Sequence, residues 1–120
     1  MNNKPKYSIF KNTHYAIEGL RHALKTEMSF KVELFCAIFI IIGIIFIDAS
    51  FNSKLILLVT GILVLIVELI NSAIENVVDL VTIDIHPLAK SAKDLGSSAV
   101  MFAILLHVAT WVAVLYKSYF

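Results

Sequence analysis

Four polar side chains recur every three or four residues along one long apolar segment of this chain, namely Glu68, Asn71, Glu75 and Asp79. At about 100° per residue in an α-helix, they fall within an arc of about 80° and share one helix face. Helical rise places Glu68 near the inner edge of a hydrocarbon core about 30 Å thick, and Glu75 about 10 Å further out. An ionised carboxylate at the depth of Glu68 costs on the order of 2.5 kcal/mol or more, which makes Glu68 a functional-site hypothesis.

The depths of the two glutamates predict two different roles. Glu68 suits a general base acting on a group delivered from the lipid phase. Glu75 suits a hard divalent cation such as Mg²⁺, which usually takes one or two carboxylates together with substrate phosphates. Glu27 lies at a similar depth and is the nearest second ligand. The structural alternative is that the carboxylates only form ion pairs with basic residues of a helical bundle, namely Arg21, Lys31, Lys90 and Lys93.

The glycines do not form a glycine-rich phosphate loop of the G-x-x-x-x-G-K-[ST] or G-x-G-x-x-G kind. The segment 86–94 instead can open a helix with Pro87 in its first turn and present Lys90 and Lys93 three residues apart. Ammonium groups beside carboxylates and a cation are the parts that phosphoryl transfer needs. The alternative is that both lysines serve only membrane topology.

These residues belong to a chain of 120 residues that is 59% hydrophobic, with a mean hydropathy of +0.86. That composition predicts a single all-α integral-membrane domain over residues 1–120. Apolar runs predict transmembrane helices over about 31–49, 54–81 and 91–117, the second with a cytoplasmic extension. Residues 8–26 alternate apolar and polar side chains at helical spacing, which predicts an amphipathic helix on the membrane surface, or alternatively one packed on protein.

Charge gives the orientation and excludes one class of partner. A net charge of +1 gives no electrostatic case for nucleic-acid binding. Two basic residues, Lys54 and Lys117, fall on one side of the predicted membrane. The positive-inside rule puts the N-terminus and the 82–90 loop in the cytoplasm, since eight basic residues lie on that side: Lys4, Lys6, Lys11, Arg21, Lys25, Lys31, Lys90 and Lys93.

Three short helices cannot enclose two substrates and all these carboxylates, so we expect a homo-oligomer. Small residues around Gly96 would let the third membrane helix approach another backbone closely. His107 lies in the middle of that helix, and we expect it to be hydrogen-bonded within the bundle rather than to act as a ligand or proton relay.

Two segments, ELINSAIENVVD (68–79) and AKDLGSSAV (92–100), closely resemble the prokaryotic membrane diacylglycerol kinases, which share a family with the undecaprenol kinases. The resemblance extends over nearly the whole chain, including YAIEGLR at 15–21 and the pair Thr110–Trp111. It implies a homotrimer in the bacterial inner membrane, with a surface helix and three transmembrane helices in each subunit. The active sites would lie between neighbouring subunits.

The resemblance also implies roles for individual residues. Glu68 is similar to the catalytic base at the lipid hydroxyl, and Glu27 and Glu75 to the ligands of the Mg²⁺ that bridges the ATP phosphates. The ATP site implied by resemblance comprises Tyr15, Glu27, Asn71, Glu75, His86, Lys93 and Asp94. The implied lipid site comprises Arg21, Phe30, Glu33, Glu68, Ser97 and Trp111.

Two positions depart from the family pattern. Ser8 replaces an arginine that diacylglycerol kinases can carry, so Lys6 or Lys11 would have to supply any nucleotide contact from there. Ile17 replaces a tryptophan that some members carry.

The resulting prediction is a lipid kinase that transfers the γ-phosphoryl group of MgATP to the primary hydroxyl of diacylglycerol and yields phosphatidic acid. Undecaprenol is the alternative acceptor, favoured by HPLAK at 86–90, whereas AKDLGSSAV favours diacylglycerol. A small proton-coupled transporter would distribute its ionisable groups across the membrane depth, but here nearly all charges lie at one end. A structural oligomer without catalysis is the other alternative.

Overall fold

The computed structural model describes residues 6–120, and Lys4, one of the basic residues predicted to be cytoplasmic, lies outside that range. This part of the chain forms four α-helices and no strand, with α1 at Ile9–Thr26, α2 at Met28–Phe46, α3 at Phe51–Val81 and α4 at Pro87–Tyr119. The predicted all-α architecture is confirmed. Helices α2, α3 and α4 are each long and apolar enough to cross a membrane.

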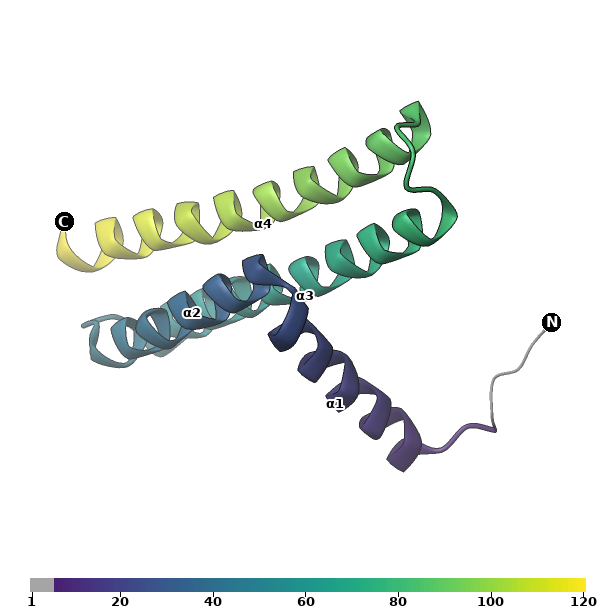
Figure 1. Cartoon of the computed structure of the whole chain (residues 1–120). Helices are drawn as coiled ribbons and strands as arrows, with labels where there is room; N and C mark the ends of the chain where they lie inside the picture. Colours follow the sequence, from purple (N-terminus) through teal and green to yellow (C-terminus); the bar gives the residue numbers. More distant parts are fainter. Residues whose placement is uncertain (1–5) are drawn as a thin grey trace.

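The junction between α1 and α2 is a single residue, Glu27. Its backbone is extended (φ −102°, ψ 101°), and its N–H donates to the Ala23 carbonyl at 2.9 Å, which ends α1. The chain turns there, so α1 projects away from the other three helices (Figure 1). Apolar side chains of α1 such as Ile17, Leu20 and Leu24 are exposed, as expected of a helix that lies on a membrane surface.

Helices α3 and α4 pack side by side in opposite directions (Figure 1). With 31 residues, α3 is about 46 Å long, longer than a hydrocarbon core of about 30 Å. Helix α4 begins at Pro87, before the predicted start near residue 91, because proline suits the first helical position and His86 Nδ1 accepts from the Leu88 N–H at 3.1 Å. At the far end, the Asp48 N–H donates to the Tyr119 hydroxyl at 3.1 Å, which ties α4 to the α2–α3 loop.

The apolar core is small and lies toward that far end. Ile44, Leu57 and Val114, one from each membrane helix, form its centre. Most other apolar side chains face outward, as a helical bundle in lipid requires. Polar groups are buried as well. Towards the opposite end, the inward face of α3 buries Glu68, Asn71 and Ser72, while Ser53 and Thr60 of α3 and His107 of α4 are buried nearer the core.

Candidate functional site

Two carboxyl groups meet where α2 packs on α3. Glu68 is only 4% exposed, and its side chain interacts with that of Glu33 on α2. Within residues 6–120, no lysine or arginine forms an ion pair with either of them. Glu33 Oε2 is also buried without a hydrogen-bond partner in that part of the chain. Buried polar atoms are nearly always hydrogen-bonded, so an open carboxylate oxygen beside Glu68 marks a place that a ligand can complete.

One helical turn further along α3, Asn71 and Glu75 form a second polar group. Asn71 Nδ2 donates to Glu75 Oε1 at 3.2 Å, while Asn71 Oδ1 is buried and finds no partner in the described chain. Gly96 of α4 lies directly against this amide, since a Cβ atom there would sit 2.1 Å from Asn71 Oδ1. The absence of a side chain at position 96 therefore leaves the room that the Asn71 side chain occupies.

Further along α3, the carboxylate of Asp79 is already neutralised by an ion pair. Asp79 pairs with Lys93 of α4 at 2.6 Å. The alternative that the carboxylates form structural ion pairs thus holds for Asp79. Glu68 and Glu75 form no ion pair with a lysine or arginine of residues 6–120, and Arg21 instead pairs with Glu18 at 2.7 Å on its own helix.

Glu27 and Glu75 fit the requirements of Mg²⁺ only in part. Glu27 lines a hollow between α1 and α3 with Ser72 and Asn76. Residues 6–120 contain no cluster of three or more histidine, cysteine, aspartate or glutamate side chains able to hold a metal by themselves. Two carboxylates suit Mg²⁺ only when substrate phosphates and waters complete its coordination. Glu75 does not line the hollow beside Glu27, so the single chain offers the donors that a nucleotide-bound ion needs without forming a closed site.

The remaining predicted site residues are not all gathered at these groups, since Trp111 packs against the apolar core at the other end of the bundle. Phe30 is buried near the start of α2, and Trp111 is partly buried on α4. Tyr15 is about half exposed on α1 and Ser97 is exposed on α4, so a single chain does not enclose them. His86 caps α4, and Asp94 pairs with Lys90.

The structure also brings together three residues that the sequence did not link. His107 Nδ1 lies 2.8 Å from Thr60 Oγ1 on α3, and Trp111 Nε1 donates to His107 Nε2 at 3.0 Å. The expectation that His107 is hydrogen-bonded within the bundle is confirmed. Gly61 lies under the imidazole, and a Cβ there would be 3.2 Å from His107 Cε1. In the sequence, the hydroxyl of Thr60 stands out within the apolar part of α3 and could have indicated a buried hydrogen bond. Nothing in the sequence indicates that Gly61 makes room for a ring.

Comparison with known proteins places this chain in a family. The family model described as "Prokaryotic diacylglycerol kinase" matches residues 14–115. The chain is similar to the diacylglycerol kinase of Escherichia coli strain K12, with 36% identity over 111 residues, covering 92% of this chain and 91% of that protein. It is also similar to the diacylglycerol kinase of Pseudomonas aeruginosa, with 36% identity over 107 residues, covering 89% of this chain and 87% of that protein. The diacylglycerol kinase of Haemophilus influenzae is 35% identical over 109 residues, covering 90% of this chain and 92% of that protein.

Proposed function

Because this chain belongs to the prokaryotic diacylglycerol kinase family, we propose that it transfers the γ-phosphoryl group of ATP to the primary hydroxyl of diacylglycerol, yielding phosphatidic acid. The relatives compared above are all named diacylglycerol kinases, which favours diacylglycerol over undecaprenol as the acceptor. The structural observation that carries the proposal is Glu68, which is buried beside Glu33 and forms no ion pair with a basic group of the described chain.

In the proposed reaction, Glu68 accepts the proton of the lipid hydroxyl as that oxygen attacks the γ-phosphorus. A new oxygen–phosphorus bond forms, the bond between the γ-phosphorus and the bridging oxygen breaks, and ADP leaves with the bridging oxygen. Diacylglycerol has one hydroxyl, which meets Glu68, and otherwise only ester oxygens. In its protonated form Glu33 can donate a hydrogen bond through its open oxygen, Oε2, to one of those ester oxygens. Because the site is buried, these contacts act in a low-dielectric environment, where they are stronger than in water.

The nucleotide would bind further out along α3. Glu27 and Glu75 are the residues that would hold Mg²⁺, which when bound would neutralise charge on the ATP phosphates. Lys93 would exchange its partner Asp79 for a phosphate oxygen, because both partners are partly exposed and such pairs are weak. Asn71 holds Glu75 through its amide group.

The assembly and location are part of the same proposal. A homotrimer in the bacterial inner membrane, with the N-terminus in the cytoplasm, is supported by the family resemblance and by the excess of basic residues on one side. Exposure of Tyr15 and Ser97 in the single chain agrees with active sites that a neighbouring subunit completes.

The test uses the purified protein in mixed micelles with labelled ATP, Mg²⁺ and either diacylglycerol or undecaprenol. We expect label in phosphatidic acid, loss of label when Mg²⁺ is chelated, and a loss of about 10²-fold or more in the Glu68→Gln variant, the range for removal of a general base. Asp48→Asn is the matched control, since Asp48 lies at the opposite end of the bundle.

Each unexpected outcome removes a specific part of the proposal. Label mainly in undecaprenyl phosphate would replace the substrate. Label in neither lipid would end the kinase proposal. A Glu68→Gln variant with full activity would reject Glu68 as the base.

A further inference from the structure

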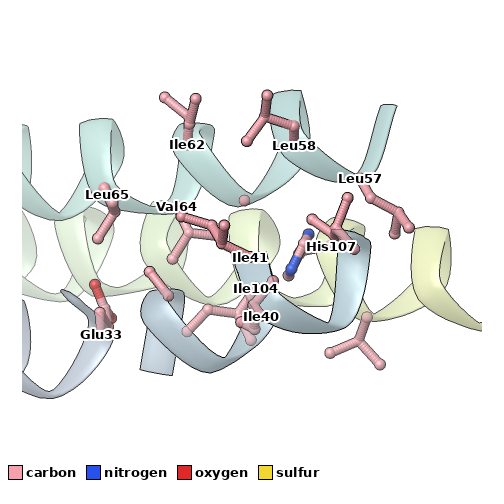
Figure 2. Close-up of a pocket in the computed structure, with 14 residues that line it drawn as sticks. Glu33, Ile40, Ile41, Leu57, Leu58, Ile62, Val64, Leu65, Ile104 and His107 are labelled. Carbon is pink, nitrogen blue, oxygen red and sulfur yellow. The ribbon is translucent and has the colours of Figure 1, made fainter. Parts of the chain in front are cut away.

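A cavity of about 260 Å³ lies between α2, α3 and α4, and Glu33 stands at one end of it (Figure 2). Of the fourteen residues that line it, Glu33 and His107 are the two polar ones, and the others are apolar or glycine. Along α3 the lining extends from Leu65 to Leu57, a rise of about 12 Å. The cavity therefore extends from Glu33 into the apolar depth of the bundle.

His107 forms part of the wall in the deeper half of this cavity (Figure 2). Its ring occupies the space that a side chain at position 61 would fill, because Gly61 has none. Both ring nitrogens are engaged: Trp111 can only donate, so Nε2 accepts from it, and Nδ1 carries the proton that faces Thr60 Oγ1. The imidazole is thus held in one orientation, with its carbon edge against Gly61.

We propose that this cavity takes one acyl chain of the diacylglycerol substrate and that His107, seated on Gly61, sets how long and how bulky that chain can be. The proposal rests on the proposed function. Three observations favour an acyl chain as the occupant. One end lies at Glu33, beside the carboxylate that would meet the lipid hydroxyl, and apart from His107 the lining beyond it is apolar or glycine. The volume is below the range of about 300–1,000 Å³ typical of whole-ligand pockets, so it suits one chain rather than an entire lipid.

Chain-length selectivity tests this role. The measured quantity is the ratio of kcat/KM for dioleoylglycerol to kcat/KM for dioctanoylglycerol. His107→Ala opens the deep half, and we expect the ratio to rise about tenfold, the effect of small changes in an apolar specificity pocket. Gly61→Ala adds a methyl group to the wall, 3.2 Å from Cε1, so the imidazole must shift by a few tenths of an ångström and the space is narrowed. We expect the ratio to fall, by less than the rise in His107→Ala.

Gly43→Ala is the matched control. It is the same substitution in a membrane helix, but its methyl would meet only Trp111 Cη2 at an ordinary 3.6 Å, and Gly43 does not line the cavity. We expect its ratio to equal that of the unmodified protein. If His107→Ala fails to assemble, Gly61→Ala still gives the answer because it adds one methyl group and removes nothing.

A second measurement needs no activity and no variant. Trp111 is the chain's one tryptophan and contacts His107, so its fluorescence reports on the cavity. We expect a diacylglycerol brominated near the end of one acyl chain to quench Trp111 in micelles, and unlabelled dioleoylglycerol to relieve the quenching far better than phosphatidylcholine does.

The proposal is overturned if neither Gly61→Ala nor His107→Ala changes the ratio, or if phosphatidylcholine relieves the quenching equally well. Equal relief would mean that bulk lipid or another part of the assembly, rather than substrate, lies beside His107. Failure of the proposed function gives a different result, because the unmodified protein would then phosphorylate neither diacylglycerol.

Discussion

Replacing Gly96 with alanine should damage the nucleotide end of the site without substituting any predicted site residue. A Cβ at this position would sit 2.1 Å from Asn71 Oδ1, whereas non-bonded atoms prefer separations of about 3.5–4.0 Å. The Asn71 side chain must therefore move by more than about 1 Å. That movement breaks the 3.2 Å bond from Asn71 Nδ2 to Glu75 Oε1 and releases Glu75 from its present orientation.

The expected loss is large because Glu75 is a proposed metal ligand and Asn71 supports it. Loss of such a supporting contact typically costs about 10–100-fold in metal affinity or activity, and a shift of about 1 Å in a reacting group has a similar effect. We therefore expect kcat/KM for ATP to fall by about 10–100-fold in Gly96→Ala, with part of the loss recovered at raised Mg²⁺ concentration. Overpacking should also lower stability by about 1–3 kcal/mol.

Steady-state kinetics in mixed micelles over a series of Mg²⁺ concentrations measures this effect, with thermal unfolding recorded on the same samples. Gly43→Ala is the control for the change in helix propensity, since its methyl has room. A folded Gly96→Ala protein with normal kcat/KM and normal Mg²⁺ dependence would refute the argument that Asn71 positions Glu75. A loss of activity that follows unfolding alone, with no change in Mg²⁺ dependence, would also refute it.

Two further predictions follow from contacts at the two ends of the site. Asp79→Asn should leave the thermal midpoint nearly unchanged, because the ion pair with Lys93 is partly exposed. It should lower the KM for ATP at low salt, because Lys93 then has no carboxylate partner to leave when it binds a phosphate. An unchanged KM would show that Lys93 does not contact the nucleotide. Trp111→Phe removes the donor to His107 Nε2 and should lower stability by about 1–3 kcal/mol in thermal unfolding, so an unchanged midpoint would contradict the hydrogen bond.

Helical periodicity was enough to place the polar face of α3, because a regular helix converts residue spacing into direction. It identified Glu68, Asn71 and Glu75 as residues of one face, and the structure buries the first two on the inward side of α3. Composition and apolar run length were likewise enough for the all-α architecture with three membrane-length helices. These are local properties, and none of them depends on how the helices pack.

Pairings between helices could not be read from the sequence in this way. The contact of Gly96 with Asn71, and that of Gly61 with His107, depend on the register of α4 against α3, which spacing within one helix does not determine. The start of α4 at Pro87 shows a smaller limit of the same kind: hydropathy located the apolar part of the helix, whereas its start depends on the cap formed by His86.

The polar residues Glu68, Asn71 and Asp79 of α3 differ in whether their surroundings within the described chain supply every hydrogen-bond or ionic partner. That difference indicates where substrates would bind. Asp79 already has its cation, Lys93. At the levels of Asn71 and Glu68, the buried oxygens Asn71 Oδ1 and Glu33 Oε2 lack partners within residues 6–120, at a cost of about 1–3 kcal/mol for each such group. A fold retains such costs where function needs them, since activity and stability trade against each other in a binding site. The unsatisfied groups lie within about two turns of α3, where bound substrates would supply the missing hydrogen bonds.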